Sequence, residues 1–111
     1  MLAVKKVIQI YRDAKEREPF LDWLHSLKDK TVKARIQNRL RRVEWGQFGD
    51  WKSVGEGVFE LKLHFGAGYR VYFGEEGDKI IVLLLGGDKS MQNKDIKQAR
   101  EYWRDYKETL R

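Results

Sequence analysis

The sequence predicts one α+β domain over residues 1–111, in which a helical hairpin packs on one face of a four-stranded, mainly antiparallel sheet. The main observation is that the second half of the chain holds three apolar runs with short connections, which is typical of an antiparallel meander. Two segments before this meander and one after it carry apolar residues at helical spacing. The expected order of elements is therefore β-α-α-β-β-β-α.

The N-terminal third is expected to contain one strand and the first helix. Residues 3–11 alternate loosely between apolar and polar side chains, as a strand does. Pro19 suits the first turn of a helix, where its missing N–H costs no hydrogen bond. Phe20, Trp23 and Leu24 follow at helical spacing and indicate the buried face of this helix.

A second helix is predicted from about residue 31 to residue 45. Asp29 or Thr31 can cap its start, and Gly46 can end it. The basic side chains fall mostly outside its apolar stripe, which consists of Val32, Ile36, Leu40 and Val43.

The remaining segments complete the predicted sheet and the last helix. Residues 46–57 hold four of the ten glycines and are expected to form a loop. Residues 80–85 are continuously apolar, as expected of a strand covered on both faces. The predicted strands cover residues 58–65, 69–75 and 79–86, and the last helix covers residues 93–110.

Polar side chains of two neighbouring strands gather on one face of the predicted sheet. Glu60, Lys62 and His64 alternate with apolar residues, so they share the face opposite to the core. On the next strand, Arg70 and Tyr72 share one face in the same way. We expect this polar face to stay partly open, because the helical hairpin covers the other one.

These residue types fit RNA cleavage without a metal ion. Glu60 can take the proton from a 2′-hydroxyl, and the guanidinium of Arg70 can hold the phosphate. His64 or Lys62 can serve as an acid or as a second cation. This set therefore forms the candidate catalytic group.

Two further side chains extend this candidate site. Lys89 follows two glycines after the last strand and can reach the same groove as Arg70. Tyr72 can stack on a base. The alternative for the whole polar face is ordinary salt pairing, chiefly of Glu60 with Arg70 or Lys62 on an exposed sheet.

Composition limits the other classes of function. The chain has no cysteine and only two histidines, far apart, so neither a disulfide nor a metal or other cofactor is expected. No run approaches the roughly 20 apolar residues of a membrane span. The N-terminal residues lack the layout of a signal peptide, and a cytoplasmic protein without a membrane partner is expected.

The net charge of +6 comes from one window. Residues 28–42 carry seven basic side chains against Asp29 alone, a surplus equal to the charge of the whole chain. Such a patch fits a polyanion such as RNA, whereas a solvated helix face and a contact for an acidic protein are the alternatives. The candidate RNA-binding residues in it are Lys33, Arg35, Arg39, Arg41 and Arg42.

Five motifs carry a resemblance to a known family. They are Pro19-Phe-Leu-Asp-Trp-Leu-His-Ser-Leu27, Gly49-Asp-Trp-Lys-Ser-Val-Gly-Glu-Gly57, Glu60-Leu-Lys62, Gly68-Tyr-Arg-Val-Tyr-Phe73 and Leu85-Gly-Gly-Asp-Lys-Ser90. Together they resemble the RelE/ParE superfamily, the toxins of bacterial type II toxin–antitoxin modules. The resemblance covers nearly the full length and is closest to the HigB-like branch of addiction module killer proteins.

This resemblance implies a RelE-like fold and a ribosome-dependent endoribonuclease that cuts mRNA. It also implies a cognate antitoxin, usually a helix-turn-helix DNA-binding protein, as partner. By position, Arg70 matches the central arginine of the family, and Lys89 matches a later basic site. Glu60 and Lys62 match polar sites of the preceding strand, while His64 is matched more loosely.

The chain departs from the family pattern at two places. Position 62 is commonly arginine in this branch, and residues 93–111 hold no histidine that could serve as the general acid. The same fold also serves toxins that inhibit DNA gyrase without cutting RNA. A gyrase inhibitor and a binding module without catalysis therefore remain as alternative hypotheses.

Overall fold

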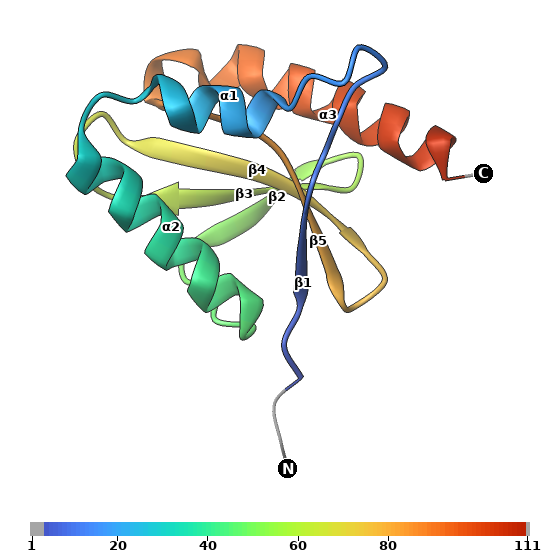
Figure 1. Cartoon of the computed structure of the whole chain (residues 1–111), viewed down its shortest axis with the longest axis horizontal. Helices are drawn as coiled ribbons and strands as arrows, with labels where there is room; N and C mark the ends of the chain where they lie inside the picture. Colours follow the sequence, from blue (N-terminus) through green and yellow to red (C-terminus); the bar gives the residue numbers. More distant parts are fainter. Residues whose placement is uncertain (1–3, 111) are drawn as a thin grey trace.

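The computed structural model describes residues 4–110, so position 3 of the first predicted strand lies outside the described residues. Within these residues, five strands and three α-helices follow one another, with a short 3₁₀ turn before the last helix. The elements are β1 (Val7–Ile10), α1 (Pro19–Ser26), α2 (Lys30–Glu44), β2 (Trp51–Gly55), β3 (Val58–Leu63), β4 (Tyr69–Glu76), β5 (Ile80–Gly87), η1 (Lys89–Met91) and α3 (Gln92–Thr109) (Figure 1).

The strands form one mixed sheet in the order β1-β5-β4-β3-β2. β1 runs parallel to β5, whereas the other three pairings are antiparallel. The predicted α+β class is therefore confirmed, but the prediction of four strands is wrong, because the described sheet has five. The additional strand, β2, lies inside the segment 46–57 that was expected to be a loop.

β2 forms because the chain turns back tightly between β2 and β3. Glu56 and Gly57 both have positive φ, at 54° and 84°, which are the signs that a two-residue type I′ hairpin turn requires. Lys52 of β2 then pairs with Glu60 of β3. Glu-Gly is a weaker turn signal than Asn-Gly, and the surrounding glycines are typical of a loop. The sequence therefore did not indicate a strand here.

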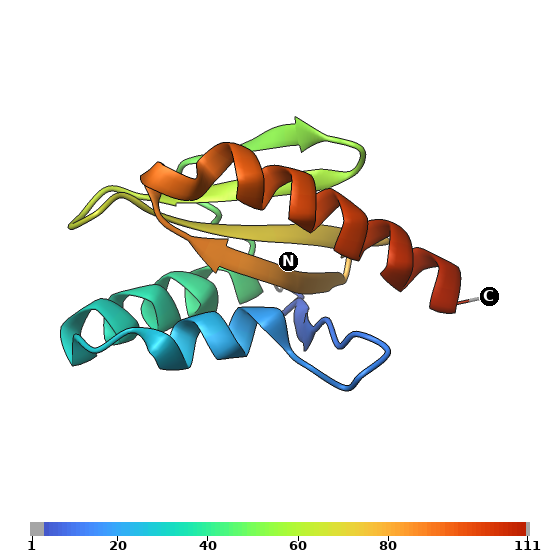
Figure 2. The same cartoon turned by 90° about the horizontal axis from the view of Figure 1, so that it is seen from above.

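Helices cover both faces of the sheet (Figure 2). α1 and α2 lie on one face, where Phe20 and Ile36 are buried in the same cluster as Leu61 of β3. This agrees with the predicted helical hairpin. α3 lies on the opposite face and buries Ala99 and Trp103 there.

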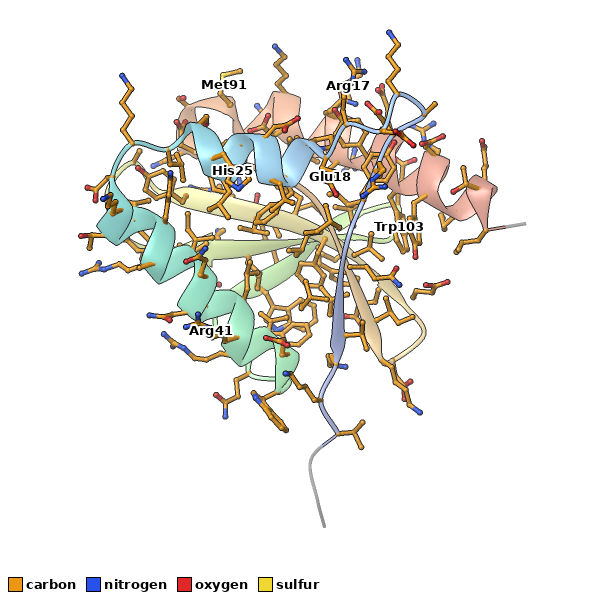
Figure 3. The ribbon with its side chains drawn as sticks, in the orientation of Figure 1. Arg17, Glu18, His25, Arg41, Met91 and Trp103 are labelled. Carbon is orange, nitrogen blue, oxygen red and sulfur yellow. The ribbon has the colours of Figure 1, made fainter. Side chains whose placement is uncertain are left out.

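α3 thus covers much of the face that was expected to remain open. Trp103 lies between α3 and the sheet (Figure 3), and its ring sits directly over Gly74 of β4. The missing side chain at Gly74 allows this close approach. On the other face, Trp23 of α1 lies over Gly86 of β5 in the same way.

Two aspartates fix the starts of helical segments. Asp29, one of the two predicted caps, accepts a hydrogen bond from the N–H of Thr31 at 2.8 Å and begins α2. Asp88 accepts one from the N–H of Ser90 at 2.9 Å and begins η1, which leads directly into α3. None of the helices among the described residues is long and apolar enough to cross a membrane.

Candidate functional site

Strands β3 and β4 place Glu60, Lys62 and Arg70 together on the face covered by α3. Lys62 lies directly opposite Arg70, and Glu60 lies directly opposite Tyr72. Glu60 and Arg70 are therefore diagonal neighbours, and Oε2 of Glu60 lies 4.0 Å from Nε of Arg70. The structure thus brings together three of the predicted catalytic side chains.

Glu60 is completely buried, although it was predicted to lie on an open face. Gln92, the first residue of α3, covers it and donates a hydrogen bond from Nε2 to Oε2 of Glu60 at 2.9 Å. A carboxylate without surface exposure cannot take a proton from a substrate hydroxyl in this arrangement. The predicted role of Glu60 as general base therefore disagrees with its burial, and its contact with Arg70 fits a positioning role.

Arg70 and Lys89 meet at the turn that joins β3 to β4. Nη1 of Arg70 donates a hydrogen bond to the carbonyl of Gly68 at 2.5 Å. A Cβ on Gly68 would lie 3.0 Å from this Nη1 and 3.4 Å from Cβ of Lys89. Lys89 is exposed and Lys62 is half-buried. Cations from β3, β4 and η1 therefore converge at one end of the sheet, and we call Lys62, Arg70 and Lys89 the cationic cluster.

Three buried polar atoms beside the cationic cluster have no hydrogen-bond partner among residues 4–110. They are Oε1 of Glu60, Nε of Arg70 and the hydroxyl of Tyr72. An unpaired buried polar group costs about 1–3 kcal/mol, so several of them in one place need an explanation beyond stability. The alternative of salt pairing is correct for Glu60 with Arg70, but the pair lies on a buried face and not on an exposed one.

Tyr72 has no exposed surface, so its ring cannot stack on an RNA base as predicted. Burial raises the pKa of its hydroxyl well above the ordinary value, and the negative charges of Glu60 and Asp95 raise it further. Asp95 comes from the first turn of α3, and burial raises the pKa of its carboxyl as well. Tyr72 therefore belongs to the floor of the site.

Gln92 and Asp95 also belong to this site, although the sequence pattern did not indicate them. Both lie in the first turn of α3, and neither belongs to a recognisable motif. The signal that could have indicated them is that they follow Lys89 closely in the sequence. A helix that starts right after η1 must place its first turn beside Lys89. Their side chains close the site from the α3 side.

His64 lies just beyond β3 and does not join the cationic cluster. Its Nε2 is 2.5 Å from Oδ2 of Asp50, and both side chains are exposed. This hydrogen bond is the main reason why the pKa of Asp50 is lowered. His64 also lines a cavity beside α2, together with Arg35 and Arg42. No group of three His, Asp or Glu side chains that could hold a metal ion occurs among the described residues.

The predicted RNA-binding side chains of α2 differ in their surroundings. Arg39 ties α2 to the sheet, because Nη1 donates to the carbonyl of Lys62 and Nη2 to that of Phe48, each at 2.8 Å. Arg41 extends from α2 (Figure 3) and donates to Oδ1 of Asn38 at 2.9 Å. Lys33 is half-buried, while the exposed members are Arg35, Arg41 and Arg42.

The chain is similar to a bacterial protein over most of its length. No protein-family model matches the chain. An uncharacterized protein of Haemophilus influenzae is 51% identical over 81 residues, which make up 73% of this chain and 82% of the relative. The two chains belong to one family. Because the name of the Haemophilus relative gives no activity, this membership carries no activity over to the chain.

Proposed function

We propose that this protein is a toxin of the RelE/ParE type that cuts mRNA on the ribosome without a metal ion. The observation that carries the proposal is the convergence of Lys62, Arg70 and Lys89 from three elements beside a buried carboxylate. The motif resemblance along most of the chain supports the same function. The RelE-like fold is part of this proposal, and the mixed sheet covered by helices is compatible with it.

The cationic cluster would bind the scissile phosphate and stabilise the negative charge that grows on it. The 2′-oxygen attacks phosphorus, and the bond to the 5′-oxygen breaks. The products are a 2′,3′-cyclic phosphate and a 5′-hydroxyl, so the proton lost by the 2′-hydroxyl is balanced by the one that the 5′-oxygen gains. Arg70 is the central group, because a guanidinium can hold two phosphate oxygens, and Glu60 fixes its orientation.

The proposal includes two macromolecular partners in the cytoplasm. The exposed arginines of α2 would dock on ribosomal RNA, since they provide positive charge far in excess of nearby acids. A cognate antitoxin, a helix-turn-helix DNA-binding protein, would block the cationic cluster. A gene for such a protein directly beside the gene for this chain is the simplest supporting observation.

A toeprinting assay on translating ribosomes tests the proposal. Wild-type protein should cut mRNA, and Arg70→Ala should cut far less. Arg104→Ala is the matched control, because Arg104 is an exposed arginine on α3 that contributes nothing to the cationic cluster. Equal cleavage by Arg70→Ala and wild type would exclude the assigned site. Intact mRNA together with inhibition of DNA supercoiling by gyrase would favour the gyrase-directed alternative instead.

A further inference from the structure

A second basic site lies between α2 and the end of β3, as a cavity of about 320 Å³. This volume is at the lower end of the roughly 300–1,000 Å³ of small-molecule sites. One stripe of α2 lines one side, with Arg35, Asn38, Arg39 and Arg42 at helical spacing. His64 and the residues next to it line the other side. No member of the cationic cluster contributes to this lining.

Three arginines line the cavity, and Asp50 is the carboxylate whose charge acts on Arg39. Arg35, Arg39 and Arg42 form no ion pair with a carboxylate within the described part of the chain, and the nearby carboxylate of Asp50 is hydrogen-bonded to His64. Burial lowers the pKa of Arg39 and the positive charge of Arg42 lowers it further, while the negative charge of Asp50 offsets part of this effect. An anionic ligand here would relieve this repulsion.

The cavity also offers a flat surface. The guanidinium of Arg35 lies over the ring of Phe65 at 5.0 Å, and the ring of Phe65 packs on Tyr69 at 5.5 Å. The guanidinium thus lies over an aromatic ring at the edge of the cavity, and guanidinium planes stack on nucleobases. Asn38 adds a hydrogen-bonding group, because its Oδ1 accepts from Arg41 and its amide N–H groups stay available to the edge of a base.

From this combination we infer that the cavity binds one nucleotide. The phosphate would lie at Arg42, with Arg39 adding charge from its fixed position, and the base would stack on Arg35 beside Asn38. An acidic peptide would satisfy the charges but would leave the flat face of Arg35 unused. The nucleotide is either free or part of an RNA chain; only the second source rests on the proposed function.

Binding measurements on the full chain test the inference. The probes are a purine nucleoside 5′-monophosphate, inorganic phosphate, a short single-stranded RNA and a glutamate-rich peptide, followed by NMR shifts and by calorimetry. The mononucleotide should bind at least about fivefold more tightly than phosphate, because stacking adds to the charge contact. The shifts should concentrate at residues 35–42 and 63–65.

Variants identify the side chains involved. Arg35→Gln should weaken mononucleotide binding at least about fivefold, by loss of the stacking plane. Arg104→Gln, which removes the same charge from α3, should leave it unchanged. RNA that binds more tightly than the mononucleotide, with the same dependence on Arg35, identifies RNA as the source; the reverse order identifies a free nucleotide.

Three results would overturn the inference: equal affinity for mononucleotide and phosphate, equal effects of Arg35→Gln and Arg104→Gln, or tighter binding of the peptide. The outcome is separable from that of the proposed function. Cleavage of mRNA without nucleotide binding at this cavity would exclude only the nucleotide site. Nucleotide binding at this cavity without cleavage of mRNA would exclude only the proposed function.

Discussion

Glu60 and Arg70 form an ion pair across β3 and β4 that lies under the first turn of α3. Their side chains are 0% and 11% exposed, and Oε2 and Nε are 4.0 Å apart. Moving two charges out of water costs free energy, and their mutual attraction often offsets only this cost. A buried ion pair is therefore weak evidence that the pair stabilises the fold. In this protein the pair holds one guanidinium in place at the end of the sheet, next to Lys62 and Lys89.

Arg70→Ala should lower mRNA cleavage by about 100-fold or more, since it removes the central donor to the growing negative charge. Arg70→Lys should be intermediate, because lysine keeps the charge but cannot hold two phosphate oxygens at once. Single-turnover cleavage on programmed ribosomes measures both rates. If Arg70→Lys were as fast as wild type, the two-oxygen contact would have no role.

Glu60→Gln should lower the cleavage rate while the acidic limb of the pH–rate profile stays in place. A positioning residue changes the rate through Arg70, whereas a general base would define that limb by its own ionisation. The profile is measured with Glu60→Gln and wild type on the same ribosomes. Disappearance of the limb in the variant would restore Glu60 as the base.

Tyr72→Phe should leave stability at neutral pH unchanged within about 0.5 kcal/mol or raise it, because the hydroxyl is buried without a partner among the described residues. The raised pKa of Tyr72 also makes the stability of the fold depend on pH in the alkaline range. Its contribution to stability is complete below the ordinary value of 10.0 and is lost as pH rises through the higher folded value. The variant should therefore unfold at higher pH than wild type in an alkaline titration. A loss of more than about 1 kcal/mol at neutral pH would show that the hydroxyl donates a hydrogen bond in the folded protein.

Gly74→Ala should destabilise the fold by about 1–3 kcal/mol, because the added methyl group meets the ring of Trp103. Urea denaturation gives the difference in unfolding free energy. Gly77→Ala is the control, since a Cβ there meets nothing within 4 Å and only its φ of 62° is unfavourable. In a Trp103→Leu background the cost of Gly74→Ala should shrink; an unchanged cost would show that the ring is not its cause.

His64→Ala should reduce cleavage much less than Arg70→Ala, since His64 pairs with Asp50 and not with the cationic cluster. It should also raise the pKa of Asp50, because it removes the hydrogen bond that lowers that pKa. Any stability gained from this pair is present above the ordinary pKa of Asp50 and is lost as pH falls through the lowered value. An NMR titration of the Asp50 carboxyl checks the shift, and an unchanged pKa would show that the contact with His64 is not its cause.

Strand periodicity was sufficient to predict that Glu60 and Arg70 share a face. The alternation of β3 and β4 fixes which side chains point the same way, and the short connection at Gly66–Gly68 fixes their register. The surface on which α3 would pack was beyond prediction, because an amphipathic stripe fits any apolar face. The burial of Tyr72 and the contact of Gln92 with Glu60 depend on that choice.

The pairing of Val7 with Ile80 joins a strand made early in synthesis to one made late. Contacts this distant in sequence are slow to form, and β5 must leave the ribosome before β1 finds its place. Gln92 and the rest of α3 emerge later still. A growing chain therefore lacks the closed site around Arg70 until α3 is free of the ribosome, so under the proposed function a nascent chain would have no assembled site for mRNA.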